Sequence, residues 1–169
     1  IPLAVKLGPQ LSSPIHFVRQ LEKAGANAVV IWNRFYQCDL DLEELEVVPH
    51  LELSRSYELL SALTWTAVMF GRVGVDLAVT GGVHTCQDAL KVLMVGASAV
   101  QLASELLRRG PERLGELVVE LGNWMREREY LSVEQLKGSM SQQRVAEPAV
   151  YLRANYLRTL QYGGERWRG

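Results

Sequence analysis

Cysteine is scarce in this sequence, neither sign of charge dominates, and no apolar run is long. Two cysteines, Cys38 and Cys86, cannot build a disulfide framework or a four-thiolate metal site. The 18 basic and 19 acidic residues give a formal net charge of −1, which argues against a nucleic-acid binder held by bulk positive charge. Nothing approaches the roughly 18 consecutive apolar residues of a membrane span, so we expect neither a nucleic-acid nor a membrane partner.

Several familiar signals are also missing. There is no basic leader followed by an apolar run, so the expected compartment is the cytoplasm. The P-loop, the GxGxxG dinucleotide fingerprint and the nucleophile elbow are absent, which removes common signatures of nucleotide and ester chemistry. The chain begins with Ile1-Pro2 rather than Met, so either residues have been removed or this is a piece of a longer protein.

What the sequence does have is a repeated alternation of short apolar runs and helix signals. Hydrophobic residues make up 48% and charged residues 22%, which is typical of a globular domain. Ser13-Pro14 combines an N-cap serine with proline at the first helical position. Thr85 followed by Asp88 indicates a second helix start. We expect strands at 3–7, 28–32, 76–79 and 98–102, and helices at 14–24, 57–70, 86–95 and 112–127.

The order of strand and helix, repeated four times, predicts an α/β fold with a parallel sheet covered by helices. An open doubly wound sheet and a (β/α)8 barrel both fit this order. A barrel needs about 250 residues, so this chain would supply half of one. Residues 33–56 are predicted as a long irregular, acidic loop. Further on we expect a short helix from Ser132, a polar loop at 138–147, a helix at 148–160 and a frayed end.

The strongest local signal for a ligand is Thr80-Gly81-Gly82-Val83, directly after the third expected strand. Paired glycines let a backbone turn sharply and come close to a ligand. The start of the following helix attracts an anion, most naturally a phosphate. Ala103 and Ser104 follow the fourth strand, where further N–H groups and a hydroxyl would meet the same anion. The alternatives are a tight turn without a ligand and, for Ser104, a helix N-cap.

Two polar residues lie at the ends of the first two expected strands. Lys6 would hold an anionic ring or substrate, unless its side chain only reaches solvent. Asn33 both donates and accepts hydrogen bonds, which suits a heterocyclic substrate, although a simple turn residue is the alternative. Arg34 would bind an anion or cap the acidic loop, and His84 is a weaker candidate for the same ligand. No metal site is expected, because the acidic residues lack a recognisable ligand spacing.

Taken together, the strand ends resemble the C-terminal half of the dihydroorotate dehydrogenases, and more closely the group called dihydroorotate dehydrogenase-like proteins. The resemblance covers roughly residues 1–160. It is carried by Ala4-Val5-Lys6-Leu7, Val30-Ile31-Trp32-Asn33-Arg34-Phe35-Tyr36-Gln37, Val79-Thr80-Gly81-Gly82-Val83, Gly96-Ala97-Ser98-Ala99-Val100-Gln101-Leu102 and Leu136-Lys137-Gly138-Ser139-Met140-Ser141-Gln142.

The resemblance implies an FMN-dependent (β/α)8 TIM barrel represented by strands five to eight. Residues 1–129 would form this half barrel, and residues 130–169 would form a helical tail of the same domain. Lys6 would approach the pyrimidine edge of the flavin and stabilise negative charge there, and Asn33 would bind a pyrimidine-like substrate. The remaining cofactor-binding residues implied by the resemblance are Thr80, Gly81, Gly82, Ala103 and Ser104.

The implied reaction is hydride transfer from dihydroorotate or a related reduced pyrimidine to FMN. The family's flavin-binding segment after strand six usually contains glycine, whereas residues 51–56 contain none. The family's catalytic base lies in the other half of the barrel. We therefore expect no catalytic residue here, and no turnover without the missing N-terminal half or a second copy. The alternatives are a non-catalytic FMN- or phosphate-binding half-barrel protein and a flavin-free barrel enzyme with a phosphate site, such as an aldolase or isomerase.

Overall fold

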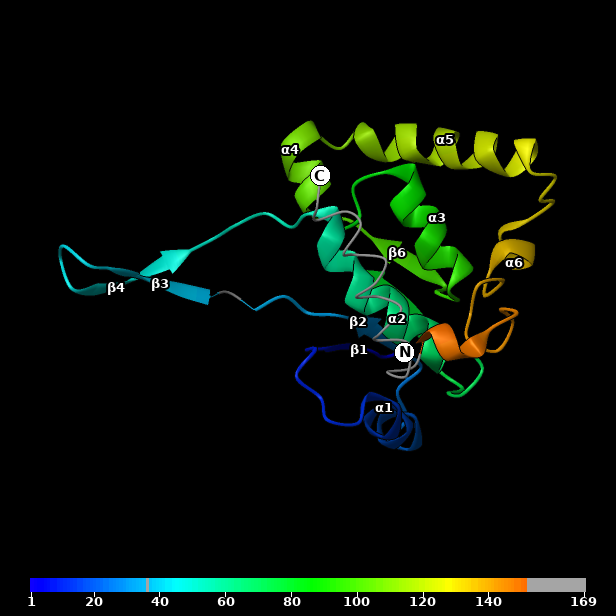
Figure 1. Ribbon diagram of the computed structural model, residues 1–169, viewed down its shortest axis with the longest axis horizontal. Coiled ribbons are helices and arrows are strands. Elements are labelled where there is room, and N and C mark those ends of the chain that lie inside the picture. The colour runs from blue at the N-terminus through cyan, green and yellow to red at the C-terminus, as the bar shows by residue number, and fades with distance from the viewer. Residues whose placement is uncertain (36, 152–169) are drawn as a thin grey trace, which may run out of the picture.

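Four parallel strands form the central sheet of the computed structural model, which describes residues 1–35 and 37–151 (Figure 1). The strands are β1 (Ala4–Leu7), β2 (Ala28–Ile31), β5 (Asp76–Thr80) and β6 (Ala99–Gln101). Their order in the sheet is β1-β2-β5-β6, with every neighbouring pair parallel. The α/β class predicted from the alternation is therefore confirmed, and the carboxyl ends of all four strands lie at one edge.

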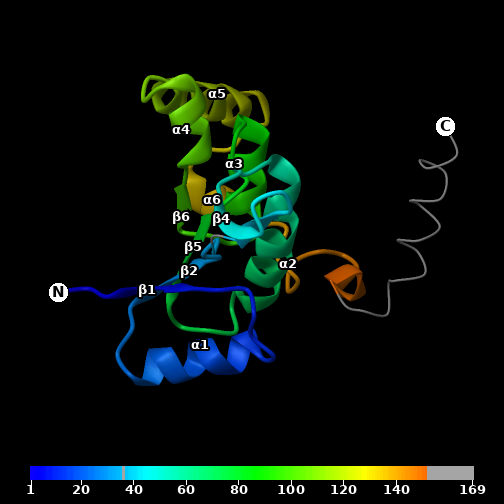
Figure 2. The same cartoon turned by 90° about the vertical axis from the view of Figure 1, so that its left-hand side faces the viewer.

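Helices follow each strand of this sheet. They are α1 (Pro14–Lys23), α2 (Leu59–Met69), α3 (Cys86–Met94), α4 (Ser104–Arg109) and α5 (Arg113–Glu127), with a 3₁₀ turn η1 (Ser56–Glu58) before α2. The Thr85 signal is confirmed, because its hydroxyl caps α3 by accepting the Asp88 N–H at 3.1 Å. The short helix α4 was not predicted. Figure 2 shows α1 at one end of the sheet and α4 and α5 at the other, with α2 and α3 between them.

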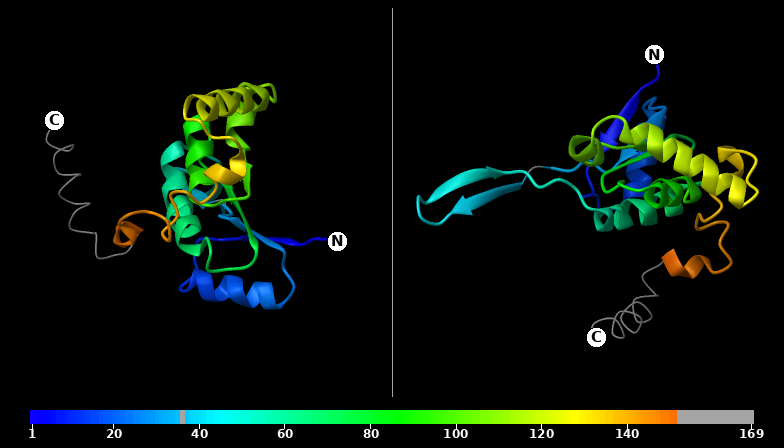
Figure 3. Two further views of the ribbon diagram at one scale, coloured as in Figure 1. Left: turned by 90° about the vertical axis from the view of Figure 1, so that its right-hand side faces the viewer. Right: turned by 90° about the horizontal axis from the view of Figure 1, so that it is seen from above.

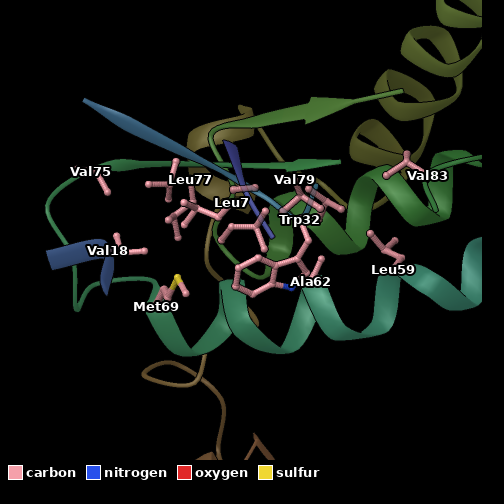
Figure 4. Packing of buried hydrophobic residues seen from close by; sticks show 14 residues of the cluster. Leu7, Val18, Trp32, Leu59, Ala62, Met69, Val75, Leu77, Val79 and Val83 are labelled. Atoms are coloured by element: carbon pink, nitrogen blue, oxygen red, sulfur yellow. The ribbon is translucent and has the colours of Figure 1, made fainter. Parts of the chain in front are cut away.

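The core lies between one face of the sheet and α2 (Figure 4). Because side chains alternate along a strand, β2 and β5 send Ile31 and Val79 into this core, where both are fully buried. Each such aliphatic side chain contributes about 1.5–3 kcal/mol when it leaves water. Other members of the core are Leu7, Val18, Val29, Leu59, Ala62, Met69 and Leu77.

The other face of the sheet is open at its two edge strands. Ala4 and Lys6 of β1 are exposed, and so are Ala99 and Gln101 of β6. The apolar run at 3–7 reads as a buried strand in the sequence, and that interpretation is wrong for alternate residues of β1. The physical reason is that helices cover only one face of this four-stranded sheet, whereas a run buried on both faces needs a layer on each side.

A β-hairpin replaces the irregular loop predicted for residues 33–56, and that prediction is wrong. Strand β3 (Gln37–Asp41) pairs antiparallel with β4 (Glu46–His50), with Gln37 opposite His50. Seen from above in Figure 3, the hairpin extends away from the body of the molecule. It leaves several large apolar side chains exposed: Leu40, Leu42, Leu45 and Val47. Alternation of apolar and acidic residues, as in Leu40-Asp41, is the strand signal that the sequence offered.

The segment after α5 folds back onto the ends of α2 and α3. The predicted short helix is present as α6 (Val133–Leu136), with Ser132 accepting the Gln135 N–H at 3.2 Å. The predicted polar loop follows, but it is held by backbone bonds from Met140 N–H to the Met94 carbonyl at 2.8 Å and from Gln142 N–H to the Ala67 carbonyl at 3.0 Å.

The chain end is described only in part. Of the helix expected at 148–160, the 3₁₀ turn η2 (Pro148–Tyr151) is described, and the rest lies outside the described residues, as does the frayed end. Within the described part of the chain, no helix combines the length and the apolar character needed to cross a bilayer.

Candidate functional site

A cleft of about 750 Å³ lies at the carboxyl ends of the strands. That volume falls in the range of small-molecule and cofactor sites, about 300–1,000 Å³. All seven residues that the sequence points to line it, although they come from four separate strand ends. They are Lys6, Asn33, Thr80, Gly81, Gly82, Ala103 and Ser104. We call the part formed by the last four of these residues the glycine end, and the part formed by Lys6 and Asn33 the lysine end.

Gly81 and Gly82 each need to be glycine, but for different structural reasons. Both have positive φ, +86° at Gly81 and +77° at Gly82, which L side chains rarely adopt. A Cβ on Gly82 would stand 2.7 Å from the Leu59 N and 2.9 Å from the Arg55 carbonyl oxygen. A Cβ on Gly81 would meet no atom within 4 Å. Gly82 therefore lets the chain pack on η1 and α2, which corrects the expectation that both glycines make room for a ligand. Gly81 is the one that stays open.

Ser104 has a hydroxyl contact rather than a capping role. It is the first residue of α4, whose N-cap position is Ala103, and it makes no side-chain cap bond. Its hydroxyl oxygen accepts the Ser54 N–H at 3.1 Å and the Ser54 hydroxyl at 2.9 Å. The N-cap alternative is therefore wrong. The single hydroxyl proton of Ser104 has no acceptor among the described residues, nor do the backbone N–H groups of Gly81, Ala103 and Ser104.

Behind the glycine end lies a buried chain of polar groups, of which sequence reasoning had named only His84. Ser54 Oγ is 3.3 Å from His84 Nε2, and His84 Nδ1 is 3.1 Å from Glu105 Oε2. We call Ser54, His84 and Glu105 the polar relay. Their residues are only 5%, 8% and 6% exposed. Ser54 also accepts the Gly82 N–H at 3.3 Å, so the relay touches the glycine loop directly.

The far end of the relay is an ion-pair network. Glu105 Oε1 lies 3.2 Å from Arg113 Nε and 3.6 Å from Arg109 Nη1. Burial acts to raise the pKa of Glu105, but hydrogen bonds from His84 and Arg113 and nearby positive charge outweigh it, and the net pKa is below its ordinary value. Arg113 also pairs with Glu116 at 2.8 Å and Glu120 at 2.7 Å, and these hydrogen bonds raise its pKa.

The lysine end is built differently. Lys6 and Asn33 both line the cleft, and their side chains make no hydrogen bond or ion pair within residues 1–35 and 37–151. Arg34 beside them also lines the cleft, but its guanidinium is engaged by protein groups. Its Nε lies 3.1 Å from Glu58 Oε2, and it also donates to the Glu52 carbonyl. Of the two alternatives for Arg34, the structure thus favours pairing with neighbouring acidic and backbone groups.

Neither cysteine has the setting of a nucleophile. Cys38 is exposed on β3, and its side chain makes no hydrogen bond within residues 1–35 and 37–151. Cys86 is buried in the first turn of α3, and burial, with the nearby Glu120 charge, raises the pKa of its thiol. A helix start favours a thiolate, but here burial prevails. Within the described residues no three His, Cys, Asp or Glu side chains gather as a metal site would require.

Comparison with known proteins decides the family. The family model described as dihydroorotate dehydrogenase matches residues 1–125. The chain belongs to this family. The resemblance read from the strand ends is thereby confirmed. This chain is 27% identical over 145 residues to dihydroorotate dehydrogenase B (NAD(+)), catalytic subunit, of Thermoplasma acidophilum. It is 29% identical over 152 residues to dihydroorotate dehydrogenase (fumarate) of Lachancea kluyveri.

The chain spans just under half the length of these relatives. The alignments cover 82% and 83% of this chain but 46% and 48% of the two relatives. A crystal structure of ligand-free dihydroorotate dehydrogenase from Eimeria tenella superposes with a TM-score of 0.64 at 22% identity, over 80% of this chain and 39% of that one. The likeness shows the fold: the four-stranded sheet is part of a (β/α)8 barrel, and of the two predicted architectures the barrel is confirmed.

Proposed function

We propose that the intact protein is an FMN-dependent oxidoreductase that takes hydride from dihydroorotate or a related reduced pyrimidine. This chain would contribute the part of the cleft that holds the cofactor phosphate. One observation carries the proposal: seven residues chosen from four strand ends line a single cleft, in a chain of the dihydroorotate dehydrogenase family. In barrels of this kind, active sites lie at the carboxyl ends of the strands.

The glycine end fits a phosphate by a steric and a hydrogen-bonding criterion. The space where a Cβ of Gly81 would stand is open, so a ligand can approach the backbone there. The N–H groups of Gly81, Ala103 and Ser104 have no partner within the described residues and line the cleft together with the Ser104 hydroxyl. A phosphate monoester offers three acceptor oxygens, so donors without acceptors are what such a group requires.

The lysine end suits the flavin ring and a planar substrate. When bound, FMN supplies the hydride acceptor of the reaction. Lys6 offers a positive charge beside the ring and favours negative charge there. Asn33 offers a donor and an acceptor on one amide, which matches the alternating groups of a pyrimidine. By its likeness to the family, whose catalytic base lies in the other half of the barrel, we expect the proton step to use a residue outside this chain.

The open face of the sheet requires a covering partner. Edge strands β1 and β6 carry unpaired backbone groups, and Lys6 and Gln101 stand exposed on the uncovered face. We expect the N-terminal half of the barrel, or a second copy of this chain, to cover it. In this arrangement the cleft gains a second wall, and the substrate is held away from water.

The protein purified at the full length that its gene encodes tests this proposal. We expect a yellow protein whose denaturation releases FMN, and which reduces a dye acceptor when dihydroorotate is added. Bound FMN without turnover of dihydroorotate or related reduced pyrimidines would favour the non-catalytic binding protein. A folded protein that stays colourless with excess FMN would contradict the cofactor assignment.

A further inference from the structure

The direction of the hydrogen bonds in the polar relay depends on whether the His84 ring carries one proton or two. Glu105 is a carboxylate whose pKa lies below its ordinary value, although burial alone would raise it, so near neutral pH it only accepts hydrogen bonds. Its partner at 3.1 Å, His84 Nδ1, must therefore carry a hydrogen whatever the charge of the ring. The other ring nitrogen, Nε2, is then an acceptor in neutral imidazole and a donor in imidazolium.

The protonation state of His84 decides where the Ser54 hydroxyl donates, because a hydroxyl has only one hydrogen to donate. With neutral imidazole, the Ser54 hydroxyl donates across 3.3 Å to His84 Nε2, and its proton points away from the cleft. With imidazolium, Nε2–H donates to Ser54 Oγ. The Ser54 proton is then free for the opposite side, where Ser104 Oγ lies 2.9 Å away. Ser54 and Ser104 both line the cleft beside Gly82.

We propose that His84, oriented by Glu105, couples proton uptake to phosphate binding at the glycine end through the hydroxyl of Ser54. The inference rests on the proposed function only in naming FMN as the natural carrier of the phosphate. A phosphate dianion accepts hydrogen bonds and donates none. It therefore favours the state in which the Ser54 proton, no longer donated to His84, can turn from Ser104 Oγ toward the phosphate and join the Ser104 proton there. In this scheme Ser54 binds the phosphate and His84 is a positioning residue.

The other charged groups around His84 keep their charge while His84 titrates. Burial acts to raise the pKa of Asp88, but hydrogen bonds from Ser56, His84 and Thr85 lower it overall, so this carboxylate is already ionised above pH 5. The charged groups that face His84 directly or through one partner are Glu105, Arg108 and Arg109 of α4, Asp88 and Lys91 of α3, and Arg113 of α5.

Thermodynamic linkage supplies the test. If phosphate prefers the protonated ring, then bound phosphate must raise the pH at which His84 titrates, because coupling between two ligands is reciprocal. We would follow the ring carbon-bound protons of the histidines by NMR between pH 5 and 8, with His84→Gln to assign the signal. The full-length protein is measured without ligand, with FMN, with riboflavin, which lacks the phosphate, and with inorganic phosphate. His16 is exposed on α1 and serves as the internal control.

We expect FMN and inorganic phosphate to raise the His84 titration midpoint by about 0.5 pH unit or more, which corresponds to about a threefold preference for the protonated ring. Riboflavin and the His16 signal should show no such shift. In Ser54→Ala the shift should vanish. FMN should bind this variant more weakly, so the midpoint is measured at an FMN concentration at which the quenching of flavin fluorescence shows saturation. In Ser104→Ala, which removes a hydroxyl that does not touch His84, FMN binding should weaken but the shift should remain.

The outcomes separate this inference from the proposed function. FMN that binds without moving the His84 midpoint would overturn the coupling and leave the cofactor assignment standing. A midpoint moved by inorganic phosphate in a chain that does not bind FMN would support the coupling and reject FMN. A midpoint that no phosphate compound moves would overturn the coupling in either case, and so would a shift that survives in Ser54→Ala.

Discussion

The two ends of the cleft are built in opposite ways. The glycine end is backed by the polar relay, whose members Ser54, His84 and Glu105 come from three separate segments and are held by buried hydrogen bonds. At the lysine end, Lys6 and Asn33 come from neighbouring strands and have no side-chain partner within the described residues. The contrast indicates that the glycine end is prearranged by this chain alone. The lysine end takes its final geometry from a ligand or a covering partner.

The largest expected effect is a loss of stability when Arg113, the ion-pair partner of Glu105, is replaced. Arg113→Leu removes the guanidinium from buried Glu105, whereas Glu116 and Glu120 are exposed enough to return to water. Removing one partner of a buried pair costs about 3–5 kcal/mol, so we expect a loss near 3 kcal/mol in the free energy of unfolding measured by urea. The matched control is Arg109→Leu, at 3.6 Å from the same carboxylate but with a 59% exposed side chain. Its cost should stay under about 1 kcal/mol, and equal losses in the two variants would contradict the role given to Arg113.

The next effect is steric. Gly82→Val places a branched side chain against the Leu59 backbone at a φ of +77°. Backbone strain and overpacking each cost about 1–3 kcal/mol, so we expect a total near 3 kcal/mol. Gly115→Ala is the control, because Gly115 lies within α5 and a Cβ there meets nothing within 4 Å. This variant should be as stable as the wild type or up to about 1 kcal/mol more stable. A Gly82→Val protein with wild-type stability would refute the packing reason for Gly82.

A smaller effect is the dependence of the free energy of unfolding on acidic pH. Glu105 has a folded-state pKa below its ordinary value of 4.5, so its ionisation stabilises the fold above that pH. This contribution should be lost as the pH falls through the folded-state pKa. Unfolding free energies measured from pH 7 to pH 3 should therefore decline less steeply in Glu105→Gln than in the wild type, although the variant is less stable at pH 7. Parallel declines in the two proteins would show that Glu105 does not contribute.

The smallest effect on stability belongs to the lysine end. Lys6→Ala should leave the urea midpoint unchanged, because the side chain is exposed and has no partner within the described residues. If Lys6 lies beside the flavin, FMN should bind about fivefold more weakly, as expected for one solvent-exposed charge contact. Flavin fluorescence titration measures this. A variant with lower stability and unaltered FMN affinity would reverse the contrast between the two ends.

Sequence patterns predicted the fold well where structure is local. The Ser13-Pro14 start and the Thr85 cap each lie within one helical turn, and both helices are present. The hairpin was missed because its apolar side chains alternate without facing a core, so the length of the segment suggested a loop. The hydrophobic pattern likewise could not tell an edge strand from a central one, as β1 and β6 demonstrate.

The candidate site divides in the same way. Strand ends are countable along a sequence, which is why seven residues chosen from four of them line one cleft. The polar relay was not predictable in this manner, since Ser54 is 30 residues from His84 and 21 more separate His84 from Glu105. Only the packing of α4 beside the glycine loop brings these groups together. His84, which closely follows the glycine pair in the sequence, was the available signal, and alone it is weak.

Backbone NMR of the glycine end shows whether the phosphate binds there. We expect FMN and inorganic phosphate to cause their largest amide shifts at Gly81, Ala103 and Ser104, whose N–H groups have no acceptor within the described residues. Riboflavin should shift these three amides little. FMN that binds, as its fluorescence reports, but leaves all three amides unmoved would contradict the claim that the phosphate sits at this end of the cleft.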